Sequence, residues 1–331
     1  MSIAPTKNST PSFRYIFFGT PDFSARILRR LVDAGMAPVA VVTAPDEPAG
    51  RKQMITPPPA KVAASMHGLP VLQPDTVRSG SFVDSVKAYA PDLFVVVAYG
   101  KILPKDLLAV ALKGALNVHP SLLPRWRGPA PIQYALLSGD EETGVSIMLL
   151  DEEMDHGPVL AQKPYPIRAD DTAATLHETL ADLGGKLLID TLSRWVSGRM
   201  EPEPQDHAKA TFSHIVKKAD GDIDWTCSAQ EIERKVRAFT PWPGAYTWFS
   251  ENGNVHRLRI LKAQYQKGVP GVPGSVIKTE NKKIAVRCGK SGADLLMLDS
   301  VQPENKSPMD GYAFSLGHSG IFESPLRSHS D

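Results

Sequence analysis

The sequence predicts an α/β fold in which a doubly wound, Rossmann-like, mostly parallel sheet is followed by a smaller OB-like β-barrel. Apolar runs alternate with amphipathic stretches over the first 198 residues, as in parallel sheets covered by helices. Beyond residue 244, short β-like runs are separated by Gly, Pro, Asn and Lys, a spacing typical of a small barrel. The length of 331 residues favours two domains, since one domain usually spans about 150 residues.

The apolar runs of the first part have the length of strands. Some are almost free of polar residues, which is typical of strands buried on both faces of a sheet. The predicted strands are residues 15–19, 39–43, 93–98, 114–118 and 145–150.

The turn after the first strand reads Gly19-Thr20-Pro21-Asp22. It contains one glycine, whereas the dinucleotide fingerprint needs a second so that the backbone can approach a pyrophosphate. A nicotinamide cofactor is therefore not expected.

The connection over residues 44–59 is long for a link between a strand and a helix, where two to six residues are usual. It is rich in proline and carries Arg51 and Lys52, with Lys61 just beyond it. One interpretation is a mobile loop. The other is a binding loop whose basic residues meet phosphates. The residues alone favour neither.

The second half begins with a long amphipathic helix that starts at Asp171-Thr172 and stops at Gly198. A stretch rich in proline and charge follows and reads as a linker. We predict a flexible tail, a first domain, a linker, a C-terminal domain and a second tail over residues 1–13, 14–198, 199–211, 212–317 and 318–331.

Composition narrows the class of protein. No apolar run approaches the roughly 18 residues of a membrane span, and the N-terminus lacks the apolar core of a signal peptide. We therefore expect a cytoplasmic protein without membrane association. Its two cysteines are too few for a disulfide framework. Residues 208–331 carry a net charge of +4 and residues 1–207 carry −3, so a polyanion partner is expected on the C-terminal part.

Candidate catalytic residues lie at the end of the predicted strand 114–118 and in a later loop. Asn117 and His119 follow the apolar run, and ligands of open α/β sheets bind beyond the carboxyl ends of strands. With Asp155 they supply an amide, an imidazole and a carboxylate. The amide and a protonated imidazole can stabilise negative charge on a carbonyl oxygen under attack by an amine. The carboxylate can orient the imidazole or collect the amine's proton. The set predicts acyl transfer without a protein nucleophile.

Blander interpretations compete with this one. A single Asn-x-His is usually a strand end with satisfied side chains, and a single Asp-x-Gly is usually a turn. Ser121 lacks the G-x-S-x-G elbow of serine hydrolases. His119, His156 and Asp155 have no zinc-signature spacing, so no metal is expected.

Read together, several motifs give the chain a close resemblance to the methionyl-tRNA formyltransferase family. The likeness covers most of residues 14–317. Its motifs are Phe18-Gly19-Thr20-Pro21-Asp22-Phe23, Val97-Ala98-Tyr99-Gly100-Lys101-Ile102-Leu103-Pro104, Asn117-Val118-His119-Pro120-Ser121-Leu122-Leu123-Pro124, Met154-Asp155-His156-Gly157-Pro158 and Arg237-Ala238-Phe239-Thr240-Pro241-Trp242-Pro243-Gly244.

The resemblance implies formyl transfer from 10-formyltetrahydrofolate to the amino group of methionyl initiator tRNA. It implies that residues 14–198 are the folate-binding catalytic domain and that Asn117, His119 and Asp155 are the catalytic set. Two further segments would hold the folate, and the residues expected there are Ser121, Leu122, Leu123, Pro124, Val97, Tyr99, Ile102 and Leu103.

The resemblance also implies that the C-terminal barrel binds tRNA, and it assigns tRNA contact to Arg51, Lys52 and Arg237. We expect a monomer with initiator methionyl-tRNA and folate as partners. A formyltransferase of the same core that acts on an amino sugar nucleotide or another small amine is the alternative. An inactive tRNA-binding or folate-binding module, or a hydrolase that cleaves the formyl donor, is a further rival.

Overall fold

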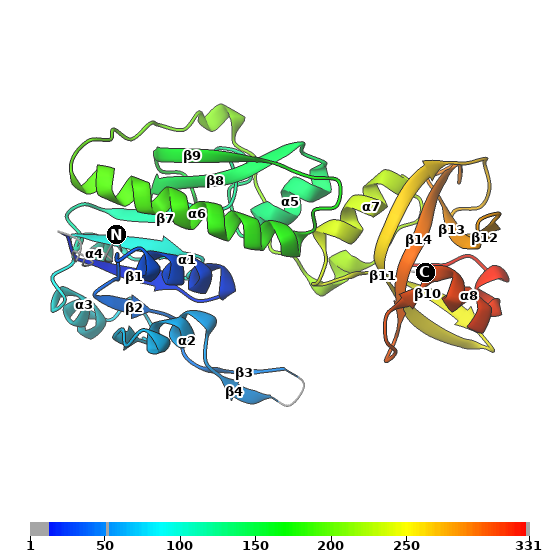
Figure 1. Ribbon diagram of the computed structural model, residues 1–331, viewed down its shortest axis with the longest axis horizontal. Helices are drawn as coiled ribbons and strands as arrows, with labels where there is room; N and C mark the ends of the chain where they lie inside the picture. The colour runs from blue at the N-terminus through cyan, green and yellow to red at the C-terminus, as the bar shows by residue number, and fades with distance from the viewer. Residues whose placement is uncertain (1–12, 51–52, 329–331) are drawn as a thin grey trace, which may run out of the picture. The chain divides into compact units, whose positions relative to one another are not determined.

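The computed structural model describes residues 13–50 and 53–328 (Figure 1). The chain divides into two compact units, which are described separately. The first contains the residues up to Pro131 together with Glu142–Pro166 and His177–Ser213, and the second contains Ile132–Glu141, Ile167–Leu176 and the residues from His214 onward.

The described part of the first unit is built on a seven-stranded sheet with the order β5-β2-β1-β6-β7-β8-β9. The five strands β5, β2, β1, β6 and β7 run parallel, and β8 pairs antiparallel with both β7 and β9. This arrangement confirms the predicted doubly wound, mostly parallel fold. The strands are β1 (Tyr15–Gly19), β2 (Ala40–Val42), β5 (Val71–Leu72), β6 (Leu93–Val97), β7 (Ala115–His119), β8 (Glu142–Leu149) and β9 (Val159–Pro166).

Helices cover both faces of this sheet, which explains why β1, β6 and β7 are buried along their whole length. On one face, Phe82 of α3 and Leu107 of α4 share a core with Phe18 and Phe94. On the other face, α1 and α6 lie side by side (Figure 1). The helices that begin in this part of the chain are α1 (Asp22–Asp33), α2 (Pro59–Met66), α3 (Gly80–Lys87), α4 (Lys105–Leu108), α5 (Pro131–Ser138) and α6 (Ala173–Val196).

A small residue lets α6 approach the sheet closely. A Cβ added at Gly184 would lie 2.9 Å from Val118 Cγ1 and 3.3 Å from Val145 Cγ1. Since β7 carries Asn117 and His119, this contact helps to fix the strand that bears two of the predicted catalytic residues.

The long connection after β2 folds as a hairpin of β3 (Glu47–Ala49) and β4 (Met54–Thr56). Its base is anchored by Asp46, which accepts hydrogen bonds from Gln73 Nε2 at 2.7 Å and Lys61 Nζ at 2.7 Å. These bonds hold the pKa of the Asp46 carboxyl below its usual value. Lys61, a phosphate contact in the binding-loop interpretation, therefore stabilises the base of the hairpin through its bond to Asp46.

The second unit contains an antiparallel sheet of order β10-β11-β14-β13-β12, with β15 paired to β14. The register shifts near Lys262 in the β11–β14 pair, and such irregularities bend and twist a sheet. The sheet confirms the predicted OB-like domain. Its strands are β10 (Ala245–Glu251), β11 (Asn254–Lys267), β12 (Val276–Thr279), β13 (Lys283–Cys288), β14 (Asp294–Pro303) and β15 (Met309–Asp310).

Helices α7 (Ala229–Ala238) and α8 (Gly311–Gly317) pack on this sheet. The start of α7 is fixed by a capping box in which Ser228 Oγ accepts from Glu231 N at 3.2 Å and Glu231 Oε2 accepts from Ser228 N at 2.8 Å. Ile232 and Val236 of α7 then join the barrel core.

The two segments expected to be a tail and a linker make specific contacts where the structure describes them. In the range 318–331, Ile321 and Leu326 are buried, because a 3-10 turn and a bridge between Arg327 and Trp248 hold them against the barrel. In the range 199–211, Glu203 pairs with Val159 through two backbone hydrogen bonds of 2.8 Å. The latter segment is therefore part of the first unit.

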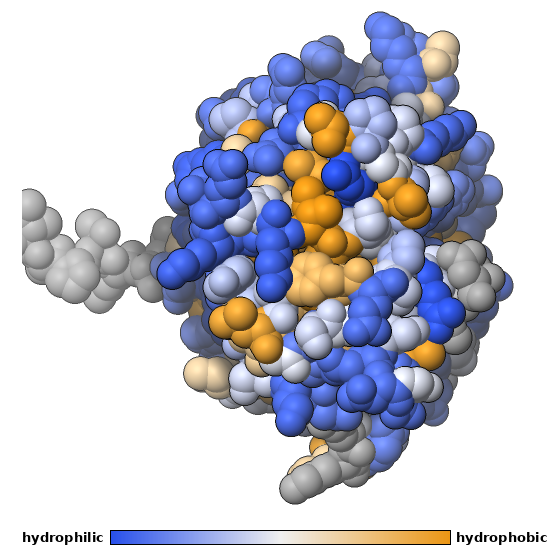
Figure 2. All heavy atoms as spheres, turned by 90° about the vertical axis from the view of Figure 1, so that its right-hand side faces the viewer, coloured by the Kyte–Doolittle hydropathy of each residue, from blue (hydrophilic) through white to orange (hydrophobic). Residues whose placement is uncertain are grey.

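The surface view in Figure 2 shows an apolar patch within a largely hydrophilic face. In the second unit, the exposed apolar side chains include Trp242, Val255 and Leu316. Within the described ranges, no helix has the length and apolar character needed to cross a membrane.

Candidate active site

Asn117 and His119 lie on β7 with their side chains largely removed from solvent. Asn117 is 9% exposed and His119 is 5% exposed. Asn117 pairs with Val96 of β6 on one side and with Met148 of β8 on the other. Two neighbouring strands therefore fix the backbone from which both side chains project.

Asp155 reaches this pair from the loop between β8 and β9. Its Oδ1 atom accepts from Asn117 Nδ2 at 3.4 Å, and its Oδ2 atom lies 3.6 Å from His119 Nδ1. The stronger bond comes from the backbone N–H of Gly128, which donates to Oδ2 at 2.7 Å. The amide, imidazole and carboxylate that are 38 residues apart at most thus converge on one point.

The second nitrogen of His119 defines the orientation of its ring. Nε2 lies 2.9 Å from the carbonyl oxygen of Trp126. A carbonyl only accepts, so Nε2 carries the proton in this contact. Nδ1 then faces the Asp155 carboxylate. A ring protonated on both nitrogens can form an ion pair with that carboxylate.

The Ser121–Pro124 loop, predicted to hold the folate, is tied to β8 and β9. Ser146 Oγ donates to Ser121 O at 2.7 Å and accepts from Leu123 N at 3.0 Å. Gln162 Nε2 donates to Leu123 O at 2.8 Å. The loop therefore has a defined shape before any ligand arrives.

Leu122 and Pro124 of this loop are partly exposed. Leu122 packs so closely on β8 that a Cβ added at Gly144 would lie 2.6 Å from its Cδ2 atom. The hydroxyl of Ser121 donates to Arg125 O at 2.6 Å, so it is engaged in shaping the loop. This contact gives no support to a serine nucleophile.

The second predicted folate segment follows β6, the neighbour of β7. Val97 and Leu103 are buried and Ile102 is 71% exposed. The Tyr99 hydroxyl is buried without a hydrogen-bond partner among the described residues, and burial raises the pKa of Tyr99 to about 12. A segment that carries both an exposed apolar side chain and an unpartnered polar group fits a ligand with an apolar ring and polar edges.

The three residues expected to contact tRNA have different outcomes. Arg51 and Lys52 lie outside the described residues. Arg237 lies on α7, where its guanidinium binds Glu233 Oε1 at 2.6 Å and Asp171 O at 3.1 Å. Its side chain is 18% exposed, so the structure assigns this cation to contacts within the second unit.

Two residues next to the predicted catalytic set were not singled out from the sequence. Arg127 is 4% exposed and Gln205 is 7% exposed, and they bind each other behind Asp155. Arg127 lies just beyond the motif that ends at Pro124. Gln205 lies in the segment read as a linker, where no local pattern distinguishes it from other polar residues.

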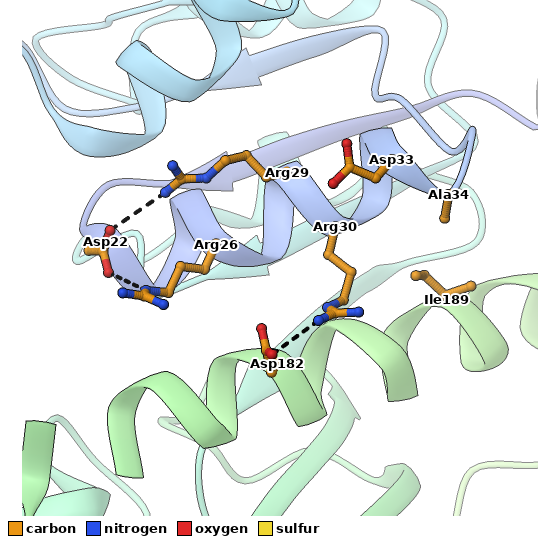
Figure 3. Close-up of a pocket in the computed structure, with 8 residues that line it drawn as sticks. All are labelled: Asp22, Arg26, Arg29, Arg30, Asp33, Ala34, Asp182 and Ile189. Atoms are coloured by element: carbon orange, nitrogen blue, oxygen red, sulfur yellow. Dashed lines mark hydrogen bonds and ion pairs between the residues drawn. The ribbon is translucent and has the colours of Figure 1, made fainter. Parts of the chain in front are cut away.

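A surface hollow between α1 and α6 carries several charged side chains (Figure 3). Arg26 and Arg29 both bind Asp22, and Arg30 binds Asp182 at 3.1 Å. Because each of these cations is already paired, the hollow does not have the character of an anion site. Within the described ranges, His, Cys, Asp and Glu side chains form no cluster of three suited to a metal.

Comparisons with known proteins identify the family. Residues 13–192 match the formyl transferase family, and residues 215–319 match the formyl transferase C-terminal domain. A methionyl-tRNA formyltransferase of Myxococcus xanthus is 46% identical over 305 residues, which cover 92% of this chain and 95% of that protein. The chain belongs to the methionyl-tRNA formyltransferase family. A methionyl-tRNA formyltransferase of Chloroflexus aurantiacus is 45% identical, with coverage of 92% and 96%.

A solved structure shares the fold of this formyltransferase at much lower identity. It is an N-formyltransferase of Helicobacter canadensis in complex with folinic acid and dTDP-3-aminofucose. Its TM-score is 0.59 at 17% identity, and the match covers 86% of this chain and 99% of that one. The likeness shows a shared fold and does not bear on the acceptor.

Proposed function

We propose that this formyltransferase moves the formyl group of 10-formyltetrahydrofolate to the α-amino group of methionyl initiator tRNA, with Asn117, His119 and Asp155 as its catalytic set. The observation that supports this best is the convergence of the three side chains, with Asp155 Oδ2 within 3.6 Å of His119 Nδ1. High identity to methionyl-tRNA formyltransferases over nearly the whole chain supports the tRNA acceptor.

The folate supplies the formyl group, and the amine of the acceptor attacks its carbon. The new bond joins the amine nitrogen to that carbon, and the bond from the carbon to the folate nitrogen breaks. An α-amino group has a pKa near 8, so a useful fraction is neutral at cellular pH without a strong base. The attacking amine must still lose one proton, and the departing folate nitrogen must gain one.

The enzyme's residues lower the barrier by stabilising charge and placing protons. Asn117 donates one N–H toward Asp155, which leaves its other N–H for the formyl oxygen. His119, when protonated, adds positive charge beside that oxygen. One such donor contributes about a hundredfold or more in rate. Asp155 holds His119 in place and receives the amine's proton, directly or through water.

The two loops beyond β6 and β7 fit the folate. Ile102 offers an exposed apolar side chain, and Tyr99 offers a buried hydroxyl that lacks a partner among the described residues. Val97 and Leu103 of the same segment are buried. The Ser121–Pro124 loop is the second folate segment, and its backbone hydrogen bonds to Ser146 and Gln162 keep it ordered.

For tRNA, we propose contacts by Arg51 and Lys52 and by the C-terminal domain. Several basic residues of that domain are engaged within it: Lys235 donates to Asp222 O, Arg259 to Pro241 O, Arg257 to Glu304, and Arg237 to Glu233. Lys262 is exposed, and no described group binds its ammonium. We therefore assign phosphate contact to Lys262 and a structural role to Arg237.

We also propose that the enzyme acts as a monomer in the cytoplasm. Asn117, His119 and Asp155 all come from one chain, so a second copy is not needed to complete the set. Charged initiator tRNA, the proposed acceptor, is a cytoplasmic molecule.

The acceptor is tested by supplying labelled 10-formyltetrahydrofolate with three acceptors in parallel. We expect rapid transfer to methionyl initiator tRNA, much slower transfer to elongator methionyl-tRNA, and no transfer to dTDP-3-aminofucose. Transfer to the sugar in preference to tRNA would identify an amino-sugar enzyme. Release of formate without any amine would identify a hydrolase.

Replacement of Ser146 tests the proposed folate loop. Ser146→Ala removes the hydroxyl that joins Ser121 O and Leu123 N, so the loop should lose its fixed shape. We expect the KM for 10-formyltetrahydrofolate to rise about tenfold, corresponding to about 1.4 kcal/mol, while kcat changes less. Ser193→Ala on α6, whose hydroxyl bonds only Ile189 O, is the matched control. An unchanged folate KM in Ser146→Ala would contradict the assignment.

Charge changes at Lys262 and Arg237 separate tRNA contact from structure. Lys262→Glu should raise the KM for tRNA. It should also reduce the slope of log KM against log salt by about one, as expected for the loss of one phosphate contact. Arg237→Gln breaks the bond to Glu233 and should lower the melting temperature with the salt slope unchanged. If Arg237→Gln alters the salt slope and Lys262→Glu does not, the two roles are reversed.

A further inference from the structure

A buried hydrogen-bond network lies directly behind the catalytic loop. Its centre is the carboxamide of Gln205, which is 7% exposed. Gln205 Oε1 accepts from Arg127 Nε at 3.1 Å and from Arg127 Nη2 at 2.8 Å. Gln205 Nε2 donates to Asp155 O at 2.9 Å and to Gly157 O at 2.7 Å. Both lone pairs of Oε1 are thus directed to Arg127 and both N–H groups to the catalytic loop, so the hydrogen-bonding capacity of this side chain is fully used.

Arg127 determines which way the carboxamide points. A guanidinium only donates, so it must face Gln205 Oε1, and this leaves both N–H groups of Gln205 for the loop carbonyls. Within the described ranges, no carboxylate binds Arg127. Its remaining side-chain contact is Nη2 to His207 Nδ1 at 2.8 Å. His207 in turn stacks on His156, the neighbour of Asp155, with ring centroids 4.1 Å apart and an interplanar angle of 2°.

The backbone of Asp155 needs such support. Its φ of +51° lies in the left-handed region, which is unfavourable for a residue with a Cβ atom. A residue held there persists when the surrounding structure fixes it. The side chain is fixed by the N–H of Gly128 at 2.7 Å, and the main chain on both sides of His156 is fixed by Gln205.

We propose that Gln205 is a positioning residue for Asp155, oriented by the buried guanidinium of Arg127. It acts through the main chain of residues 155–157 and sets the distance and direction of the Asp155 carboxylate relative to His119 and Asn117. The proposal rests on the catalytic role proposed above for Asp155. It also makes the segment between α6 and the C-terminal domain a part of the catalytic site.

Gln205→Glu is the sharpest test, because it keeps the shape and the acceptor for Arg127. At neutral pH the carboxylate has no N–H groups, so it loses both bonds to the loop and places oxygen against the carbonyls of Asp155 and Gly157. A displacement of about 1 Å at a reacting group can cost up to about a hundredfold in rate. We expect kcat to fall about tenfold to a hundredfold, with the KM for each substrate within about twofold.

Gln302→Glu is the matched control, since Gln302 also donates to a backbone carbonyl, that of Lys306, in the second unit. It should leave kcat unchanged. If Gln205→Glu does not fold, Gln205→Asn is measured in its place, because it keeps the amide and loses the reach to the loop. A kcat within twofold of the parent in a folded variant at position 205 overturns the proposal.

A double-mutant cycle shows whether Gln205 acts through Asp155. If it does, adding Gln205→Glu to an Asp155→Asn enzyme should lower kcat by less than twofold further, because the group being positioned is already lost. If the double variant instead loses kcat by the product of the two single fold-reductions, Gln205 acts independently of Asp155 and the proposal is overturned. If Asp155→Asn alone is harmless, the proposed role of Asp155 fails, which is a separate outcome from an unaltered Gln205 variant.

Discussion

The site depends on how the Asp155 carboxylate is held. It accepts a short bond from the backbone of Gly128 and a longer one from Asn117, and it faces the ring of His119. Asp155 has a left-handed backbone, so its side chain takes this direction only while the loop around it is fixed. If the loop relaxed, Asn117 and His119 would remain on their strand without the group that organises them.

Several distant parts of the chain meet to maintain this geometry. The sheet fixes Asn117 and His119 through the neighbours of β7. Hydrogen bonds from Ser146 fix the adjacent Ser121–Pro124 loop. The segment around Gln205 fixes the main chain at Asp155. The proposed mechanism of positioning and charge stabilisation, without a protein nucleophile, depends on this degree of order.

The sequence predicted the fold class because its signals are local. Continuous apolar runs gave β1 and β6, and short runs between turn residues gave the barrel strands. Asn117 and His119 could be found because they end a predicted strand. Asp155 had only a turn-like context of its own, and it joined the set through its chemistry and the family resemblance.

Other features could not be read from the chain because they depend on contacts between distant residues. Gln205 binds residues 48 and 50 positions away, and its Pro-rich surroundings resemble a linker. Arg237 is assigned tRNA contact by the family resemblance, and its guanidinium also donates to Asp171 O, which lies 66 positions away. The burial of Ile321 and Leu326 depends on the finished barrel, so their segment reads as a tail in the sequence alone.

The most direct test of the central claim is the single-turnover rate of formyl transfer by Asp155→Asn, with enzyme in excess over charged initiator tRNA. The amide keeps the shape of the carboxyl group and removes its charge, so folate binding measured by fluorescence should stay within about twofold of the parent. The account predicts that the transfer rate falls by about a hundredfold or more. A rate close to that of the parent enzyme would contradict it.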